Sequence, residues 1–354
     1  MDLVFQDINN TTVYCRTISN QSIELASALE KCYPFRGHSN GEHTKCIITS
    51  SGINAISVAL QSLLIKHNGV PINIIKGSEL YCDTPRLIRY FRTIFKFNEY
   101  TIDVNDSNKF LDLFDNQVKD QINILLLESA SNPSGDIFDF ELIKILRKKS
   151  KILYTIIDNT WLTHVIFNPF NYDADIVITS LTKYYSSGKC IAGAIICKKK
   201  LYGIMHNFIK INGMNVSPLH CQIVLDNINT IESRIIASSK TIISVTDFLK
   251  RNPQFEIRHS SITSDPSHIK ALKFFNKNNG ETIYPSVISI IIPLGLDDAV
   301  EWMKSTGIEY KTSYGSNKSR FNNWPNEIKE NYTQCRLSIG YDDDYQMLIK
   351  KLEY

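Results

Sequence analysis

An acidic residue and a lysine each stand just after an apolar run of strand length. Asp158 ends one such run, and Lys183 follows shortly after a second run, Ile176 to Thr179. In an open α/β sheet, ligand-binding groups gather at the C-terminal ends of the strands. We therefore expect Asp158 and Lys183 to face the same crevice, although they lie 25 residues apart in the sequence.

An amine and an acid in one crevice suit a flat cofactor that carries an aldehyde. A partly desolvated lysine loses proton affinity, becomes a nucleophilic amine and can form a Schiff base with an aldehyde. A carboxylate opposite it can hold a protonated pyridine nitrogen, so the pair meets two requirements of pyridoxal phosphate (PLP). Ser180 and Thr182 add hydroxyl groups for a phosphate. The alternative is that Lys183 is an ordinary surface lysine beyond a strand.

A second candidate phosphate site lies where a helix is expected to begin. The stretch Thr49 to Leu60 opens with small polar residues and a glycine and continues as an apolar helix. The main-chain N–H groups and the positive dipole end of such a helix attract anions, so Ser51, Gly52 and Ile53 are candidates to hold a phosphate. A plain helix N-cap explains the same pattern.

Two more polar or aromatic residues follow apolar runs. Tyr81 comes shortly after Ile72 to Ile75, where its ring is placed to stack on a flat cofactor; packing alone is the alternative. Asn132 comes shortly after Ile122 to Leu127, where its amide is placed to hydrogen-bond a ring substituent. Asn-Pro is also a common turn signal, which is the simpler explanation.

These residues belong to a predicted α/β domain over residues 41–235. Apolar runs without alternation indicate strands buried on both faces, and their alternation with helices indicates a mainly parallel sheet. The expected strands are Ile72–Ile75, Ile122–Leu127, Ile152–Ile157, Ile176–Thr179 and Ala192–Ile196. Residues 26–65 read as helix, split by a polar loop at 37–45. The domain also has a predicted helix at Phe140–Leu146, with Asp139 as N-cap, and a helix-like stretch at Leu219–Phe248 is expected to lead out of it.

The rest of the chain, residues 236–354, predicts a smaller α+β domain. It contains a strand at Val287–Ile292, a helix at Leu296–Ser305, a polar loop at Lys311–Pro325, a short strand at Cys335–Ile339 and a helix at Asp343–Leu352.

Composition excludes several classes of protein. The chain has 354 residues, 43% of them apolar, and a formal net charge of +3. Such a near balance of charge gives no electrostatic reason to expect a nucleic-acid partner. No apolar run reaches the roughly 18 residues of a membrane helix. The first residues do not resemble an export signal, which indicates the cytoplasm. The eight cysteines form no CxxC pair, so we assign no metal site.

Eight segments, taken in order, carry a resemblance to a known family. They are YCR at 14–16, SSGINAIS at 50–57, LYCDTPR at 80–86, LLLESASNP at 125–133, DNTWLT at 158–163, ADIVITSLTKY at 174–184, SPLHCQIVLDNINTIESR at 217–234 and CRLSIGYDD at 335–343. The chain, over about residues 12–354, resembles the cystathionine γ-synthase/γ-lyase family of PLP-dependent enzymes of Cys/Met metabolism. The resemblance implies fold type I, the aspartate-aminotransferase-like fold.

The resemblance also implies a role for each matching residue. Lys183 matches the Schiff-base lysine, and Asp158 matches the partner of the pyridine nitrogen. Tyr81 matches the ring-stacking tyrosine, which also handles protons, and Asn132 the asparagine beside the ring oxygen. The phosphate site is matched by Ser51, Gly52, Ile53, Ser180 and Thr182.

Substrate and partner contacts are implied in the same way. Arg336 matches the arginine that binds the substrate α-carboxylate, and Ser313 lies in the loop beside it. Tyr14 and Arg16 match a pair that reaches the phosphate of the neighbouring subunit. Residues 1–40 would then contact a partner chain, in a homodimer at least, with a homotetramer left open.

Departures from the family cluster around the substrate. Thr312 stands where relatives that cleave cystathionine often have Glu. Asp83, near Tyr81, is a candidate to read a distal cation on the substrate instead, although capping a local turn is equally compatible with the sequence.

The predicted function is elimination or replacement at the γ or β carbon of an amino acid such as cystathionine, methionine or an O-acylhomoserine. Two alternatives stay open: a catalytically degenerate relative with a structural or regulatory role, and an aminotransferase on the same fold.

Overall fold

The chain folds into two compact units. The computed structural model describes residues 18–35, 43–329 and 331–353, with only the main chain described at 325–329. The first unit contains the described residues through Ser129, together with Asp139–His164 and Asn168–Asn229. The second contains Ala130–Phe138, Val165–Phe167 and the chain from Thr230 onward.

These limits differ in detail from the predicted domains 1–40, 41–235 and 236–354. Helix α2 (Asn20–Cys32) joins the first unit because its fully buried Leu25 and Leu29 lie on the helix that packs against α9 (Pro218–Ile228) and β1 (Thr44–Thr49). Two short stretches from the middle of the sequence join the second unit, which local sequence patterns do not reveal.

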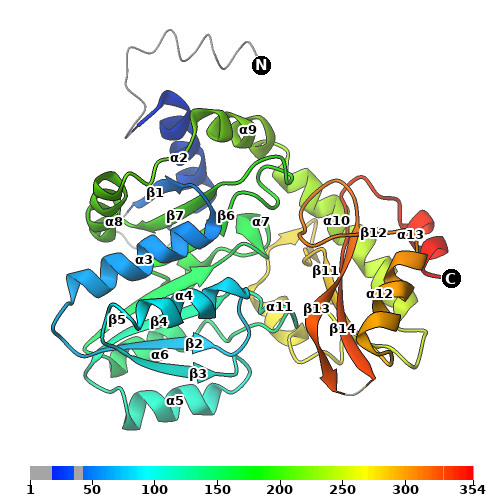
Figure 1. The fold of residues 1–354 in the computed structure, drawn as a ribbon, viewed down its shortest axis with the longest axis horizontal. Coiled ribbons are helices and arrows are strands. Elements are labelled where there is room, and N and C mark those ends of the chain that lie inside the picture. The colour runs from blue at the N-terminus through cyan, green and yellow to red at the C-terminus, as the bar shows by residue number, and fades with distance from the viewer. Residues whose placement is uncertain (1–17, 36–42, 330, 354) are drawn as a thin grey trace. The chain divides into compact units, whose positions relative to one another are not determined.

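The first unit is built on a seven-stranded sheet with the order β1-β7-β6-β5-β4-β2-β3 (Figure 1). The strands after β1 are β2 (Ile72–Gly77), β3 (Asn98–Ile102), β4 (Ile122–Glu128), β5 (Ile152–Asp158), β6 (Ile176–Ser180) and β7 (Gly193–Lys198). From β3 to β6 all neighbours are parallel, whereas β7 is antiparallel to both β6 and β1. The sheet is therefore mainly parallel, as predicted.

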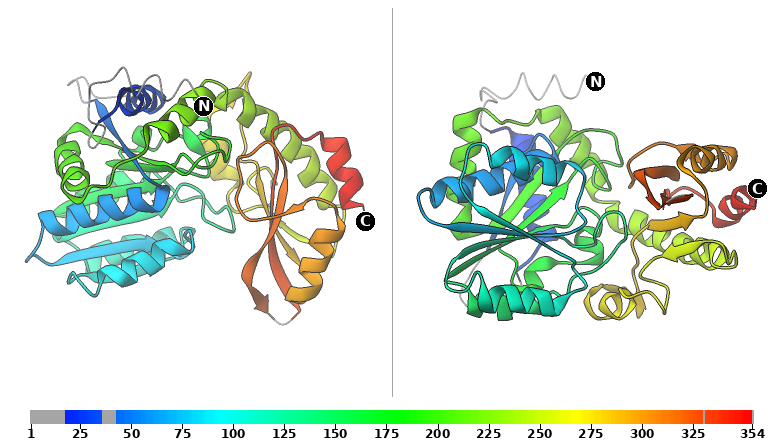
Figure 2. Two further views of the ribbon diagram at one scale, coloured as in Figure 1. Left: turned by 45° about the horizontal axis from the view of Figure 1, so that its top comes forward. Right: turned by 60° about the horizontal axis from the view of Figure 1, so that its bottom comes forward.

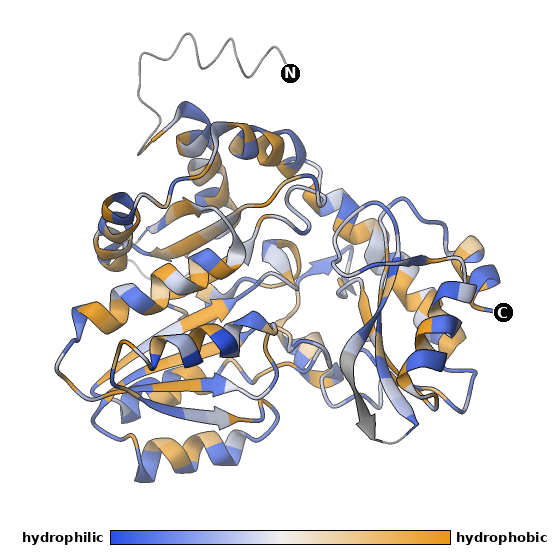
Figure 3. Ribbon diagram, viewed as in Figure 1, coloured by the Kyte–Doolittle hydropathy of each residue, from blue (hydrophilic) through white to orange (hydrophobic). Residues whose placement is uncertain are grey.

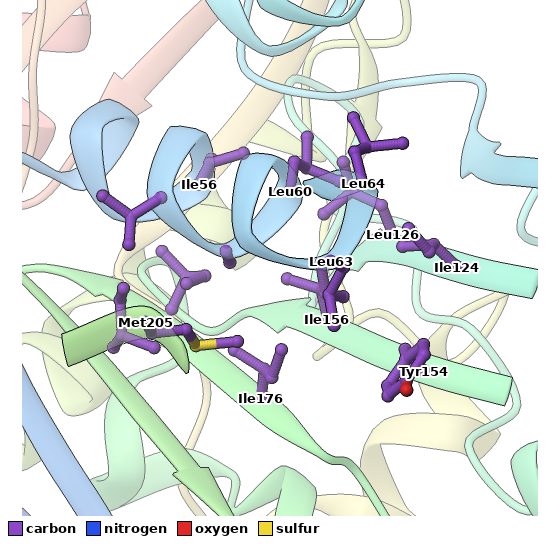
Figure 4. Packing of buried hydrophobic residues seen from close by; sticks show 14 of the residues in the cluster. Ile56, Leu60, Leu63, Leu64, Ile124, Leu126, Tyr154, Ile156, Ile176 and Met205 are labelled. Atoms are coloured by element: carbon purple, nitrogen blue, oxygen red, sulfur yellow. The ribbon is translucent and has the colours of Figure 1, made fainter. Parts of the chain in front are cut away.

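Helices cover the sheet and close its core. Apolar colour runs along the strands in Figure 3, in keeping with β2 and β4, in which every residue is buried. Helix α3 (Gly52–Lys66) contributes Ile56, Leu60 and Leu63 to a buried cluster that also includes Ile156 and Ile176 of the sheet, and Figure 4 shows Leu63 beside Ile156. This packing fixes the strand ends on which the predicted site residues stand. Further helices of this part of the chain are α4 (Asp83–Phe91), α5 (Ser107–Asn116), α6 (Leu142–Lys149), α7 (Thr163–Ile166), the 3₁₀ helix η1 (Pro169–Tyr172) and α8 (Lys199–Asn212).

The second unit is built on a five-stranded sheet with the order β12-β13-β14-β11-β8, and Figure 2 shows it in two further views. Its strands are β8 (Glu256–Arg258), β11 (Val287–Ile292), β12 (Glu309–Tyr310), β13 (Arg320–Lys329) and β14 (Tyr332–Ser338). Its helices are α10 (Ile231–Leu249), α11 (His268–Phe274), α12 (Leu296–Ser305) and α13 (Tyr345–Leu352), and β9 (Lys277–Asn278) and β10 (Glu281–Thr282) form a small hairpin.

Three of the predicted elements are wrong. Residues 44–49 form strand β1, although residues 44–45 were expected as loop and 46–49 as helix, because pairing with β7 outweighs the apparent helical pattern. The expected long helix at 219–248 is two helices, α9 and α10. The expected loop at 311–325 is partly strand, because β13 pairs with β14 from Arg320 onward. In addition, helix α6 begins at Leu142, so Asp139 is not its N-cap.

Among the described residues, no helix combines the length and the apolar character that a membrane crossing requires.

Candidate active site

Asp158 and Lys183 follow neighbouring parallel strands. Asp158 is the last residue of β5, and Lys183 lies three residues beyond Ser180, the last residue of β6. The Asp158 side chain is buried, and its Oδ1 accepts a hydrogen bond from the Thr160 main-chain nitrogen at 2.9 Å. Burial raises the pKa of the Asp158 carboxyl, while Thr160 and the positive charge of Lys183 act in the opposite direction. The structure therefore places the lysine where its charge acts on the buried acid.

Hydrogen bonds join the turn after β5 to the end of β6. The main-chain nitrogen of Ser180 donates to Thr160 Oγ1 at 2.8 Å, and that of Asn159 donates to Ile178 O at 2.8 Å. These bonds keep the segments of Asp158 and Lys183 together. Asn159 and Thr160 were not among the predicted site residues, although the polar triplet after an apolar run was a readable signal.

The first turn of α3 lies against the end of β6. A Cβ added to Gly52 would lie 2.8 Å from Ser180 Cβ, closer than real Cβ atoms approach, so only glycine fits there. Ser51 is the N-cap of α3, and its side chain accepts from the Asn54 main-chain nitrogen at 3.1 Å. The N-terminal N–H groups of α3, including that of Ile53, are thus held beside Ser180, in an arrangement that suits an anion.

The Thr182 hydroxyl is engaged with the main chain of the same loop. It donates to Ala192 O and accepts from Ala192 N, each at 3.2 Å. To donate to a phosphate, the Thr182 hydroxyl would give up its bond to Ala192 O, so its predicted role stays a prediction.

Tyr81 is anchored through its main chain. Its nitrogen donates to Glu128 Oε1 at 2.5 Å, and Glu128, the last residue of β4, lies opposite Asp158 in the register of β4 and β5. The Tyr81 side chain is partly open, with 40% of the residue exposed. Desolvation and the nearby Asp83 carboxylate raise the pKa of Tyr81 to about 12, so its phenol is protonated at neutral pH. Glu128 was not among the predicted site residues, because its contact with the Tyr81 main chain forms only in the folded protein.

Asp83 has a partner in its own helix. Arg86 Nη1 donates to Asp83 Oδ1 at 3.0 Å, three residues along α4. Asp83 is the first residue of α4, and this contact is an ion pair along the helix rather than the turn cap that the sequence left open; its reading of a substrate cation stays a prediction.

In the second unit, two asparagine side chains and two aromatic rings contact the buried Arg336. Arg336 Nη1 donates to Asn132 Oδ1 at 2.9 Å, and Arg336 Nη2 donates to Asn322 Oδ1 at 3.1 Å. The guanidinium also lies over the rings of Tyr314 and Trp324. These four contacts orient the planar guanidinium, whose donors can pair with both oxygens of a carboxylate. Such a group suits a carboxylate ligand.

Asn132 and Arg336 belong to the same compact unit, since residues 130–138 are part of the second unit. Its predicted contact with a ring oxygen stays a prediction. In the same unit, Ser313 has a positive φ of 95°, unusual for a residue with a side chain, and its carbonyl accepts from Ser338 Oγ at 3.3 Å. Thr312 is exposed. Tyr14 and Arg16 lie outside the described residues.

Comparison with known proteins identifies the family of this chain. A family model described as Cys/Met metabolism PLP-dependent enzyme matches residues 38–340. The cystathionine beta-lyase of Schizosaccharomyces pombe is 30% identical over 206 residues, which are 57% of this chain and 50% of that protein. An L-methionine gamma-lyase of Fusobacterium nucleatum subsp. polymorphum is 28% identical over 237 residues, which are 66% of this chain and 58% of that protein. The chain spans about half the length of the curated relatives it matches.

Solved structures share the fold at low identity. The cystathionine gamma synthase of Xanthomonas oryzae pv. oryzae superposes with a TM-score of 0.83 at 20% identity, covering 96% of this chain and 86% of that one. A putative O-acetylhomoserine (thiol)-lyase of Campylobacter jejuni has a TM-score of 0.80 at 23% identity, and the superposition covers 99% of this chain and 90% of that one. The structure of that protein carries a pyridoxyl-lysine phosphate.

The fold is thus that of the fold type I PLP-dependent proteins. The chain belongs to the Cys/Met metabolism PLP-dependent enzyme family. This confirms the predicted family, fold class and cofactor. The residues fit PLP: a buried acid, a lysine whose charge acts on it, and a helix N-terminus where glycine alone fits.

Proposed function

We propose that this protein is a PLP-dependent enzyme of sulfur amino-acid metabolism that catalyses elimination or replacement at the γ or β carbon of its substrate. Cystathionine, methionine and O-acylhomoserines are the substrate class. The observation that carries the proposal is the buried Asp158 at the end of β5, with Lys183 just beyond the end of the neighbouring β6, in a chain of this family.

Each residue has a task in this reaction. When bound, PLP supplies an electron sink for the carbon atoms of the substrate. Asp158 would hold the proton on the ring nitrogen, and the N-terminus of α3 with Ser180 would bind the phosphate. The Lys183 amine would anchor the cofactor and then, once displaced by substrate, move the α-proton and later the β-proton. Tyr81 would stack on the ring and, as a protonated phenol, donate to the leaving group.

A panel of γ- and β-substituted amino acids tests the proposal. The protein loaded with PLP is expected to release a keto acid and ammonia from at least one of them, or to exchange its side chain for an added thiol. A degenerate relative would show neither reaction with any member of the panel. An aminotransferase would pass the amino group to an added keto acid without releasing ammonia.

Arg336 is proposed to bind the substrate α-carboxylate. Arg336→Lys is expected to raise KM across the whole panel by about tenfold or more, because lysine does not reproduce the two-pronged donor geometry. Steady-state kinetics on three unrelated substrates measure this, with the visible absorbance of the bound cofactor as the control for an intact cofactor site. An effect confined to one substrate would count against a role at the shared carboxylate.

Asp83 is proposed to read a distal cation on the substrate. If it does, Asp83→Asn should weaken substrates such as cystathionine by roughly 1–3 kcal/mol in kcat/KM and spare methionine. Arg86→Gln is the matched control, because it breaks the same ion pair from the other side. Equal losses in both variants, or on both substrates, would assign Asp83 to the local structure of α4.

Assembly and compartment rest on the sequence. We propose a homodimer at least, in which Tyr14 and Arg16 reach the neighbouring subunit, and a cytoplasmic location.

A further inference from the structure

A chain of hydrogen-bonded side chains runs through the first unit beside the predicted cofactor residues. His164 Nδ1 lies 2.8 Å from Tyr185 Oη, and Tyr185 Oη donates to Tyr33 Oη at 3.3 Å. Asn159 Nδ2 also donates to Tyr33 Oη, at 3.3 Å. Tyr33, Tyr185 and Asn159 are buried, and His164 is partly buried. We call these four residues the Tyr33–Tyr185 network.

The network joins four separate segments. Tyr33 directly follows helix α2, and His164 lies in α7. Asn159 is the residue after Asp158, and Tyr185 lies two residues after Lys183. A displacement of the Lys183 segment would therefore stretch a hydrogen bond that leads, through Tyr33, to the turn of Asp158.

Rings reinforce the hydrogen bonds. The ring centroids of Tyr33 and His164 are 5.7 Å apart in an edge-on arrangement, and those of His164 and Tyr185 are also 5.7 Å apart. Connected and buried polar groups of this kind rigidify their surroundings. Rigidity matters here because a misplacement of about 1 Å in an active site can cost about 10²-fold in rate.

Around neutral pH the network carries no charge. Burial lowers the pKa of His164 to about 4 and raises the pKa of Tyr185 well above its ordinary value. The network therefore acts on Lys183 and Asp158 through the positions of their segments and not through charge.

We propose that His164 and Tyr185 are positioning residues, which hold the Lys183 segment in register with the turn of Asp158 so that amine and carboxylate meet the two ends of one cofactor. This inference rests on the proposed cofactor roles of Lys183 and Asp158. His164 and Tyr185 are not among the site residues predicted from the sequence.

The chain offers a matched control. His67 Nε2 lies 2.9 Å from Tyr154 Oη, so Tyr154 and His67 form a second tyrosine–histidine pair in the same unit. Tyr154 is buried near the start of β5, whereas Asp158 is at its end. Removing either tyrosine hydroxyl should cost about 1 kcal/mol of stability. Only the loss of the Tyr185 hydroxyl should weaken the binding of PLP.

The experiment compares Tyr185→Phe with Tyr154→Phe by titration of the cofactor-free proteins with PLP, without substrate. Tyr185→Phe is expected to weaken PLP retention about tenfold and to shift the pH midpoint of the visible absorbance of the bound cofactor. Tyr154→Phe should leave both unchanged, with a similar fall in the thermal unfolding temperature. His164→Leu should behave as Tyr185→Phe does, and His164→Asn, which keeps a polar atom near the position of Nδ1, should restore most of the loss.

Unchanged PLP affinity and spectrum in Tyr185→Phe would overturn the proposal, as would equal effects in Tyr154→Phe. If Tyr185→Phe does not fold, the comparison of His164→Leu with His164→Asn decides, and equal PLP binding by these two would overturn it. Because no substrate is used, a wild-type protein that binds PLP but processes no sulfur amino acid would contradict the proposed function while leaving this inference to be decided by the variants.

Discussion

Lys183→Ala is expected to lose turnover and the visible absorbance of protein-bound PLP together, because alanine has no amine to bond to the cofactor aldehyde. Absorbance spectra of the purified variant with added PLP, and keto-acid assays on the panel, measure the two losses.

Lys189→Ala is the matched control for this variant. Lys189 lies in the same loop, is exposed, and donates to Asn227 Oδ1 at 2.9 Å. Its loss removes one lysine charge from the segment and should leave the spectrum intact. A Lys183→Ala protein that kept the absorbance band and turned over near the wild-type rate would remove Lys183 from the site.

Asp158→Asn is expected to bind PLP but to turn over about 10²-fold more slowly or worse, a loss of about 2.7 kcal/mol in the transition state. A neutral amide stabilises a protonated ring nitrogen far less than a carboxylate does. Single-turnover kinetics with saturating PLP measure the effect.

The raised pKa of Asp158 gives this prediction a pH dependence. Acidification through that pKa protonates the carboxyl, so PLP binding by the wild type should weaken as pH falls, whereas binding by Asp158→Asn should change less. Glu128→Gln is the control, because it removes a neighbouring negative charge and keeps an acceptor for the Tyr81 main-chain nitrogen. Wild-type turnover in Asp158→Asn, or an equal fall in Glu128→Gln, would contradict the assignment.

The sequence predicted the centre of the fold better than its edges. Strands β2, β4, β5 and β6 are buried on both faces, and this leaves mostly apolar runs without alternation, which a single sequence displays. Strand β1 lies at the edge of the sheet and depends on its pairing with β7, a contact between residues about 150 positions apart, as for Cys46 and Ile196. No local pattern encodes that pairing.

The same division applies to the site. The positions of Asp158 and Lys183 after neighbouring strands were predictable because the apolar runs before them are local patterns, whereas their roles, which the resemblance implies, stay predictions. The grouping of Asn132 with Arg336 was not predictable, because it depends on which compact unit residues 130–138 join. Glu128 and Tyr185 were not predicted, because their contacts form only on folding. Glu128 accepts from the Tyr81 main chain, and Tyr185 contacts Tyr33 and His164.

Peptide mapping identifies the lysine that holds the cofactor of this protein. The purified protein is incubated with PLP, treated with borohydride to make the bond between lysine and cofactor permanent, and digested for peptide mass spectrometry. We predict a single pyridoxyl-modified peptide, with the modification on Lys183. Modification of other lysines with Lys183 unmodified would contradict the account.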